Sequence, residues 1–349
     1  MLRKIILNSL YYTGAQALLA RWMRGSGSIL MLHHVQNRAY SPFLPNDHLT
    51  IAPEFLEKVI TTLKAKGYEF ISMDEVAKRV AHPDRFSDKP PFIAVTLDDG
   101  YRNNLEQAVP IFNRHQVPYT IYIAPGFVEG HTPLWWEDIE AIIGSHNSIY
   151  MDTPNGTMDF DLSTLNLKLD GFDVIMDYLT TGVSQEEQRQ VVKGLCEAYH
   201  WDQSAHLKNE IMTWEEINIL SKDPLCTIGA HSIEHYALSK LDEDKLRFEM
   251  KQSRKLIESE IGYAPKHFAY PYGSKNEAGK REFQIAKQCG FISAVTTRHG
   301  VIYPEHKDHP MALPRIALNG YYQSMNYIHP LLSGVSTRLN NSGRKLDVE

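Results

Sequence analysis

The sequence predicts an α/β fold with a parallel sheet or barrel and one long insertion. Short apolar runs alternate with segments of helical periodicity along the 349 residues. Several runs are apolar throughout, which is typical of strands buried on both faces. The alternation stops between residues 131 and 210 and then resumes. One domain with an insertion therefore accounts for the chain better than two domains, although the length allows either.

Boundary residues mark three of the expected helices. A helix over 50–66 has Pro53 in its first turn and Gly67 directly after its end. Ser72 and Glu75 have the spacing of a capping box that opens a short helix. A long helix over 240–261 ends at Gly262. We expect strands between and around these helices at 28–32, 92–97, 119–124, 226–230, 267–270 and 292–297.

The N-terminal segment has the pattern of an amphipathic helix. Apolar residues recur at roughly helical spacing (Ile6, Leu10, Leu18 and Trp22), and Arg3, Lys4, Arg21 and Arg24 lie at the ends. Such a helix packs on its own domain or lies on an anionic membrane surface. A small-residue pattern over 15–17 resembles a secretory cleavage site, but polar residues interrupt the apolar run. We expect a cytoplasmic, membrane-peripheral chain, with secretion through a weak signal as the alternative.

These patterns divide the chain into three parts. The expected division is an amphipathic segment over 1–24, a barrel over 25–330 with its insertion at 131–210, and a loose polar tail over 331–349.

Composition excludes several classes of protein. The chain is 43% hydrophobic and 22% charged, as in ordinary globular proteins. A net charge of −6 gives no sign of nucleic-acid binding. Three cysteines, none of them in a CxxC pattern, argue against a disulfide framework or a cysteine zinc site. Composition says nothing about the oligomeric state.

Two polar motifs directly follow predicted strands. Asp98 and Asp99 follow the strand at 92–97, and adjacent carboxylates repel each other unless a cation or a proton lies between them. The alternative is an ordinary Asp-Gly turn. His231 and His235 follow the strand at 226–230. They face the same way if the chain turns helical there, which suits two imidazoles on one metal. The alternative is a pair of solvent-exposed histidines.

Taken together, the two motifs indicate a catalytic metal site, and a third motif adds to this interpretation. One Asp and two His leave metal positions open for water and substrate, which is typical of catalytic sites, and the second Asp is then free to act as a base. In the third motif, Pro271 and Gly273 make a stiff turn that can aim the Tyr272 N–H at a developing oxyanion. A plain Pro-Gly turn is the alternative.

In this order, TLDDG, HSIEH and AYPYG resemble the motifs of the polysaccharide deacetylases, carbohydrate esterase family 4 with its nodulation-factor deacetylase homology domain. The resemblance covers residues 25–320 and implies a distorted (β/α) barrel of about seven parallel strands. It also implies metal-dependent hydrolysis of an N-acyl, sometimes O-acyl, group on a sugar. By resemblance, Asp98 is the base, Tyr272 the oxyanion donor, and the ligands of a divalent metal, zinc first, are Asp99, His231 and His235.

The sequence departs from the family pattern in two places. Ala269 stands where the family usually has an Arg that orients the base, and Arg315, after the last predicted strand, is our candidate to replace it. No Leu-x-His follows residue 291 to supply the general acid. Residues 27–34 are similar to that missing strand, as in a circularly rearranged branch, with His33 as the acid and His34 beside it. In a closed barrel the first and last strands are neighbours, so the site is preserved.

The resemblance implies removal of an N-acetyl group from an amino sugar in a glycan or glycan precursor. Alternatives are deformylation or deacetylation of a lipid-linked amino sugar, hydrolysis of another non-peptide amide, and an inactive glycan-binding barrel. The amphipathic N-terminus favours a lipid-linked sugar as partner. The expected substrate-binding residues are Pro271, Tyr272, Trp135, Trp136 and His34.

Overall fold

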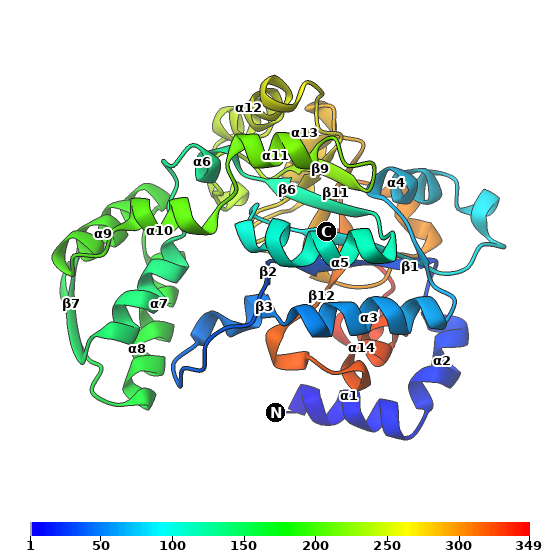
Figure 1. The fold of residues 1–349 in the computed structure, drawn as a ribbon, viewed down its shortest axis with the longest axis horizontal. Coiled ribbons are helices and arrows are strands. Elements are labelled where there is room, and N and C mark those ends of the chain that lie inside the picture. The colour runs from blue at the N-terminus through cyan, green and yellow to red at the C-terminus, as the bar shows by residue number, and fades with distance from the viewer. Residues whose placement is uncertain (1) are drawn as a thin grey trace.

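Seven parallel strands close into a barrel in the computed structural model, which describes residues 2–349, with side chains from residue 3 (Figure 1). The order around the barrel is β1-β12-β11-β10-β9-β6-β5, and β5 pairs back to β1. A short strand, β4 (Glu69–Phe70), adds to β5 from outside. The barrel strands are β1 (Gly27–Leu32), β5 (Phe92–Leu97), β6 (Tyr119–Ile123), β9 (Cys226–Ala230), β10 (His267–Ala269), β11 (Ser293–His299) and β12 (Leu313–Ala317). The expected distorted barrel of about seven parallel strands is confirmed.

The pairing register of the strands brings their C-terminal ends to the same level. Every residue of β1, β5 and β6 is buried, as their continuously apolar sequence predicts. Pairing between β1 and β5 runs unbroken from Gly27 opposite Phe92 to Leu32 opposite Leu97. The next residues, His33 and Asp98, therefore leave the barrel at the same level. Because all the barrel strands are parallel, every motif that follows a strand lies at this one end.

Helices cover the outside of the barrel. They are α3 (Pro53–Ala65), α4 (Met73–Ala81), α5 (Val109–His115), α11 (Trp214–Leu220), α12 (Glu243–Ile261), α13 (Lys280–Gln288) and α14 (Met325–Leu332). The predicted helix over 50–66 starts too early, because Thr50 and Ile51 form β3 and pair with β2 (His34–Val35). The predicted helix over 240–261 also begins later, at Glu243, where the Asp242 side chain caps it.

The insertion between β6 and β9 builds a lobe beside the barrel (left in Figure 1). It consists of α6 (Pro125–Val128), α7 (Trp135–Ser145), a hairpin of β7 (Ser148–Thr153) and β8 (Gly156–Asp161), α8 (Leu165–Asp177), α9 (Gln185–Ala198) and α10 (Gln203–Glu210). Its hydrophobic core is separate from that of the barrel but includes Phe43 and Tyr101 from the barrel side. These shared side chains join the lobe to the barrel.

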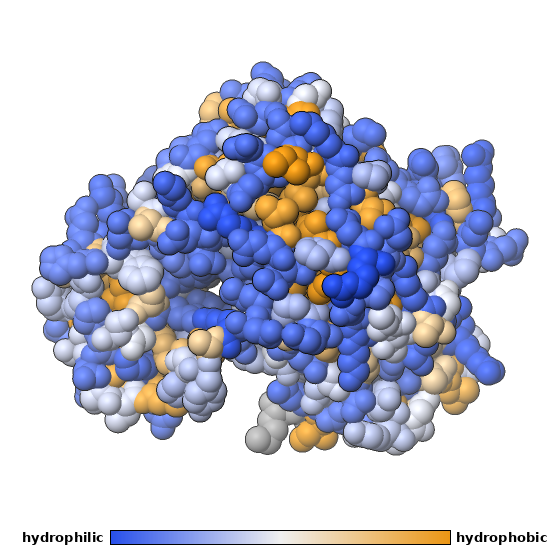
Figure 2. Space-filling model, viewed as in Figure 1, coloured by the Kyte–Doolittle hydropathy of each residue, from blue (hydrophilic) through white to orange (hydrophobic). Residues whose placement is uncertain are grey.

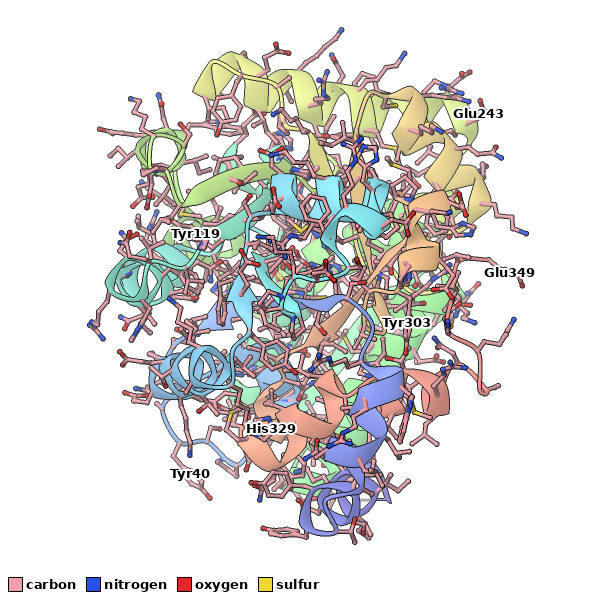
Figure 3. The ribbon with its side chains drawn as sticks, turned by 90° about the vertical axis from the view of Figure 1, so that its right-hand side faces the viewer. Tyr40, Tyr119, Glu243, Tyr303, His329 and Glu349 are labelled. Carbon is pink, nitrogen blue, oxygen red and sulfur yellow. The ribbon has the colours of Figure 1, made fainter. Side chains whose placement is uncertain are left out.

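Both ends of the chain differ from the prediction. The single N-terminal helix is wrong, because Gly14 (φ 70°) separates α1 (Leu2–Tyr12) from α2 (Ala15–Met23). This α1–α2 hairpin packs on α14 and α15 (Val335–Asn340), and the Tyr11 ring stacks on His329 of α14 at 5.9 Å (Figure 3). The loose tail is also wrong over 335–340, since Val335 is buried in α15. No helix in residues 2–349 is long and apolar enough to cross a membrane.

Candidate active site

The sequence motifs meet at one end of the barrel. Asp98 and Asp99 follow β5, His231 follows β9, Tyr272 follows β10 and His33 follows β1. The two Asp and His231 are almost fully buried. Asp99 and Tyr272 have left-handed backbone (φ 72° and 59°), and so does His235 (φ 52°). Non-glycine residues in this region are strained, and such strain concentrates at functional sites.

Asp99, His231 and His235 converge on one point. The Nε2 atoms of both histidines lie 3.4 Å from Asp99 Oδ1, and the three potential ligand atoms lie within 4.8 Å of one another. The chain does not turn helical here, which was the condition for the two rings to face the same way by spacing: residues 231–235 form an irregular loop with Ser232 at φ 57°. The two rings therefore meet through a strained loop and not through helical spacing.

The protonation of this cluster suits a cation. The His231 Nδ1–H donates to the Ala269 carbonyl at 2.8 Å, so the lone pair on Nε2 faces Asp99. Burial lowers the pKa of His235 to about 3, which keeps that ring neutral. Burial acts to raise the pKa of Asp99, but the imidazoles hold it below its ordinary value. Among the described residues no donor satisfies the buried Asp99 Oδ1. Two imidazole lone pairs and a carboxylate with an unsatisfied oxygen fit a divalent cation such as zinc.

Arg315 binds the carboxylate of Asp98 from within the barrel. It lies on β12, not after the last strand as the sequence suggested, and its side chain is fully buried. Its Nη1 and Nη2 donate to the two oxygens of Asp98, each at 2.7 Å, and its Nε donates to the Thr296 carbonyl at 2.9 Å. Burial acts to raise the pKa of Asp98, but the Arg315 guanidinium lowers it below its ordinary value. Asp98 is thus a fixed, ionised carboxylate beside the cluster.

His33 lies beside Asp98 at the pocket wall. Its Nε2 is 3.9 Å from Asp98 Oδ2, and its side chain is 19% exposed, so a ligand can reach it. Burial lowers the pKa of His33, although Asp99 and Asp98 act to raise it. The Asn104 amide donates to the His33 carbonyl at 2.7 Å and fixes the backbone here.

The third motif forms a tight turn, as its sequence predicts. Thr297 donates its Oγ1–H to the Tyr272 carbonyl at 2.5 Å and its N–H to the Gly273 carbonyl at 3.0 Å. Within the described residues the Tyr272 N–H has no acceptor. The Trp135 indole N–H donates to Tyr272 Oη at 3.1 Å, which links the turn to the insertion.

These groups line a pocket of about 380 Å³. The expected residues His33, Trp135, Trp136 and Tyr272 line it, whereas Pro271, His34 and Arg315 do not. Sequence reasoning did not anticipate the remaining apolar wall, which comes from the barrel, the loop before β3 and α8: Met31, Leu49 and Met176. The donor cluster therefore lies at a largely apolar recess between the barrel and the insertion.

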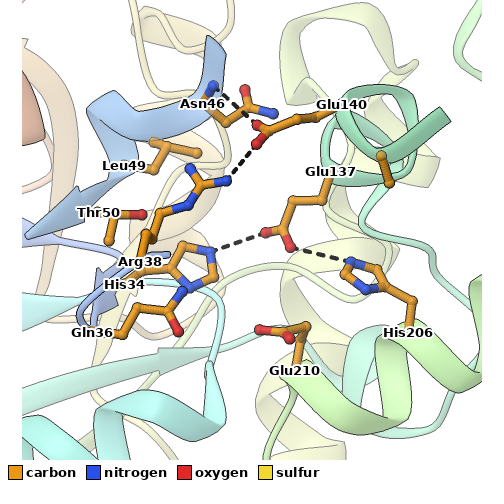
Figure 4. A pocket seen from close by; sticks show the side chains of 11 residues that line it. His34, Gln36, Arg38, Asn46, Leu49, Thr50, Glu137, Glu140, His206 and Glu210 are labelled. Atoms are coloured by element: carbon orange, nitrogen blue, oxygen red, sulfur yellow. Dashed lines mark hydrogen bonds and ion pairs between the residues drawn. The ribbon is translucent and has the colours of Figure 1, made fainter. Parts of the chain in front are cut away.

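His34 lies instead in a neighbouring cavity of about 220 Å³ (Figure 4). The Asn103 amide donates to its Nδ1 at 2.8 Å, so its Nε2–H donates to Glu137 of α7 at 3.0 Å. Glu137 also accepts from Tyr101 Oη at 2.8 Å and lies 3.2 Å from His206 Nε2. Nothing in the sequence indicated this link, whose partners are 36 to 103 positions apart. It fixes α7, and with it Trp135 and Trp136, against the barrel.

The family model described as polysaccharide deacetylase matches residues 87–293. The chain belongs to the polysaccharide deacetylase family. The matched segment contains all three motifs but neither His33 nor Arg315. As a family member, this polysaccharide deacetylase is a hydrolase of amide C–N bonds, and its family supports deacetylation of a glycan.

Solved structures of deacetylases share the fold. Deacetylase PplD of Streptococcus pyogenes, determined with acetate, is 17% identical over 87% of this chain and 97% of its own, with a TM-score of 0.57. IcaB from Ammonifex degensii is 16% identical over 88% and 98%, also at 0.57. The de-N-acetylase from Aggregatibacter actinomycetemcomitans is 14% identical over 87% and 98%, at 0.53. No curated protein sequence matches this chain significantly.

Proposed function

We propose that this polysaccharide deacetylase removes an N-acetyl group from an amino sugar, with a divalent metal held by Asp99, His231 and His235. The convergence of these three donor atoms within 4.8 Å, beside the ionised Asp98, carries the proposal. A bound divalent cation, zinc first, supplies a Lewis acid that polarises a carbonyl and lowers the pKa of water from about 15.7 towards about 7.

Asp98 and His33 divide the proton transfers. Asp98 accepts a proton from the attacking water, and Arg315 keeps its carboxylate ionised and oriented. The new C–O bond forms as water adds to the amide carbon. His33 then donates a proton to the nitrogen as the C–N bond breaks, which gives acetate and the free amine.

Three further groups act on the substrate. The Tyr272 N–H donates to the oxyanion that develops on the amide oxygen. Trp135 and Trp136 offer ring faces at the pocket wall for a sugar. His34 and Pro271 act indirectly, since neither lines the pocket: His34 secures α7, and Pro271 stiffens the turn that carries Tyr272.

A second candidate substrate is an acylated amino sugar linked to a lipid. The exposed apolar and basic residues of the α1–α2 hairpin favour it, because they suit a lipid surface. The alternative of an inactive glycan-binding barrel has no support, since the complete set of donors faces the pocket.

Mass spectrometry distinguishes these substrates. Metal-loaded enzyme is incubated with N-acetylated chito-oligomers and, separately, with acetylated and formylated lipid-linked amino sugars. We expect loss of the acyl mass from one class, and no loss with a chelator or with Asp98→Asn, which keeps the size of the side chain. Loss that Asp98→Asn leaves unchanged would contradict the role of this carboxylate. No loss from any of these substrates would contradict the proposed reaction.

A further inference from the structure

The α1–α2 hairpin exposes many apolar side chains. Of the seventeen large apolar residues exposed in the described part of the chain, five lie on this hairpin: Ile5, Ile6, Tyr12, Leu18 and Trp22. Leu18 and Trp22, 56% and 69% exposed, are four residues apart on α2 and so share one face. Figure 2 shows apolar groups at the lower edge of the molecule, over α1 and α2. A soluble monomer rarely exposes such a group of residues without a partner for it.

The two chain segments that form this part of the molecule contain no acidic residues. The chain has 42 Asp and Glu, yet none occurs in residues 1–46 or in 309–346, the segment that forms β12, α14 and α15. The two segments contain nine basic residues: Arg3, Lys4, Arg21, Arg24, Arg38, Arg315, Arg338, Arg344 and Lys345. Arg315 is buried against Asp98, and three others pair with acidic residues: Arg38, Arg344 and Lys345. The basic residues that accompany the exposed apolar groups are therefore those of the hairpin and its end: Arg3, Lys4, Arg21 and Arg24.

The start of the hairpin is linked to the pocket through a chain of contacts. Arg3 and Lys4 each lie 5.6 Å from the ring of Tyr322. The adjacent Tyr321 donates from Oη to the Pro45 carbonyl at 3.2 Å, and its ring is 6.0 Å from His48, which lines the pocket. The start of α1 is thus linked to the pocket wall through Tyr322, Tyr321 and His48. The end of α2 lies beside Ser26 and Phe92, at the other end of the barrel strands.

Figure 3 extends this surface to one more aromatic residue. Tyr40, 95% exposed in the loop between β2 and β3, points to the same lower side of the molecule as α1. Helix α8 also exposes apolar residues, such as Leu167, but Asp170 and Asp173 on that helix are unsuited to an anionic surface. We therefore confine the surface to the hairpin and Tyr40.

We propose that the exposed face of the α1–α2 hairpin docks on an anionic lipid membrane. Trp22, Leu18 and Ile5 enter the headgroup region, and the basic residues around them bind lipid phosphates. A second copy of the chain suits this face less well, because a symmetric contact would bring like charges together. Only one consequence rests on the proposed function: docking brings the enzyme to the membrane that would carry its acylated glycan.

Vesicle binding tests the docking surface without any substrate. The full-length protein is sedimented with vesicles of phosphatidylcholine alone and with vesicles that also contain phosphatidylglycerol. We expect binding to the mixed vesicles only, weakened by added salt. The exposed Trp22 should shift its fluorescence to shorter wavelength on binding. Trp22→Phe should still bind but lose this shift, because the other tryptophans lie elsewhere.

Matched variants distinguish vesicle binding through this surface from non-specific adsorption to lipid. Arg21→Gln with Arg24→Gln should weaken binding about fivefold for each charge removed. Leu18→Ser with Trp22→Ser should weaken it further. The controls are Lys193→Gln with Lys251→Gln for charge, and Ile219→Ser with Phe248→Ser for exposed apolar area (62% and 57% exposed). These controls lie on α9, α11 and α12 and should bind like the parent protein.

Three results would overturn the docking surface. The first is equal binding to both kinds of vesicle. The second is that the control variants weaken binding as much as the surface variants do. The third is that the protein binds no vesicles and instead forms a dimer, which Trp22→Ser dissociates. The last result would identify the face as an interface between copies of the chain. Vesicle binding by an enzyme that deacetylates nothing would leave the surface intact and contradict only the proposed reaction.

Discussion

Arg315 and Asp98 form a two-point ion pair inside the barrel, 217 positions apart in the chain. Arg315 lies on β12 and Asp98 directly follows β5, and these strands are the two neighbours of β1. Both distances are 2.7 Å, and further bonds to Thr96 Oγ1 (3.1 Å) and the Thr296 carbonyl (2.9 Å) hold the guanidinium plane. A planar fork matched to a carboxylate fixes orientation as well as charge, which a lysine does not do. We therefore propose that Arg315 orients Asp98 in place of the family arginine, whose position is occupied by Ala269.

Arg315→Lys should lower kcat by about 10²-fold, at the low end of what acid–base catalysis contributes, because the charge remains but Asp98 is no longer held at two points. KM should change little, since Arg315 does not line the pocket. Steady-state kinetics on the identified substrate measures both constants. Arg298→Lys is the matched control, a buried arginine that binds main-chain carbonyls away from the pocket. A fall in kcat no larger than that of the control would refute the positioning role.

His33→Ala should damage amide hydrolysis far more than ester hydrolysis. An amine leaves poorly without a proton, whereas an alkoxide or phenolate leaves more readily, so only the amide needs the acid. We expect kcat/KM to fall about 10²–10⁴-fold on an N-acetyl sugar and much less on an aryl acetate. Equal losses on both substrates would count against His33 as the acid.

Zinc should stabilise the folded protein through Asp99, His231 and His235. A ligand that binds only the folded state at about 100 times its Kd adds about 2.7 kcal/mol. Thermal unfolding with and without zinc should show a higher Tm with the metal, reversed by a chelator. His235→Ala should lose this shift in Tm. The control is His146→Ala, which should keep the shift, because His146 directly follows the C-terminal end of α7 in the insertion. Retention of the shift in His235→Ala would place the metal elsewhere.

Glu137 should make stability depend on pH in a defined window. Burial acts to raise its pKa, but His34 and His206 hold it well below the ordinary 4.5. Its carboxylate therefore stabilises the fold above about pH 4.5, and this stabilisation is lost progressively as the pH falls below 4.5. For His206, burial acts to lower the pKa, but Glu137 raises it above 6.5, so its contribution is present below that value and lost at higher pH.

The variant Glu137→Gln should cost about 1–3 kcal/mol, because it leaves buried partners poorly satisfied. The difference in free energy of unfolding from the parent should be largest between pH 4.5 and 6.5 and shrink on the acid side. Denaturant unfolding across this range measures it. A difference that does not change with pH would show that the ionic contacts of Glu137 contribute nothing.

Local patterns were enough for six of the seven barrel strands and for the three motifs, whereas β12 was missed. The expected strands over 92–97 and 226–230 coincide with β5 and β9. A short, continuously apolar run is buried on both faces in a parallel barrel, so it is readily predicted as a strand. Parallel strands also force the residues that follow them to one end, so the sequence alone predicts that Asp98, Asp99 and His231 lie together. The N-terminal segment was less well predicted, because Gly14 breaks it and Leu7, outside the predicted stripe, is the residue that packs.

What the sequence by itself determined is the type of fold, the strand ends and the chemical groups that follow them. Tertiary structure alone decided how those groups meet. Barrel closure brings Arg315 to Asp98, a strained loop rather than a helix turns His235 towards Asp99, and Glu137 ties the insertion to His34. The physical reason is range: apolar periodicity and capping act over a few residues, whereas these contacts depend on how strands and lobes pack across hundreds of positions.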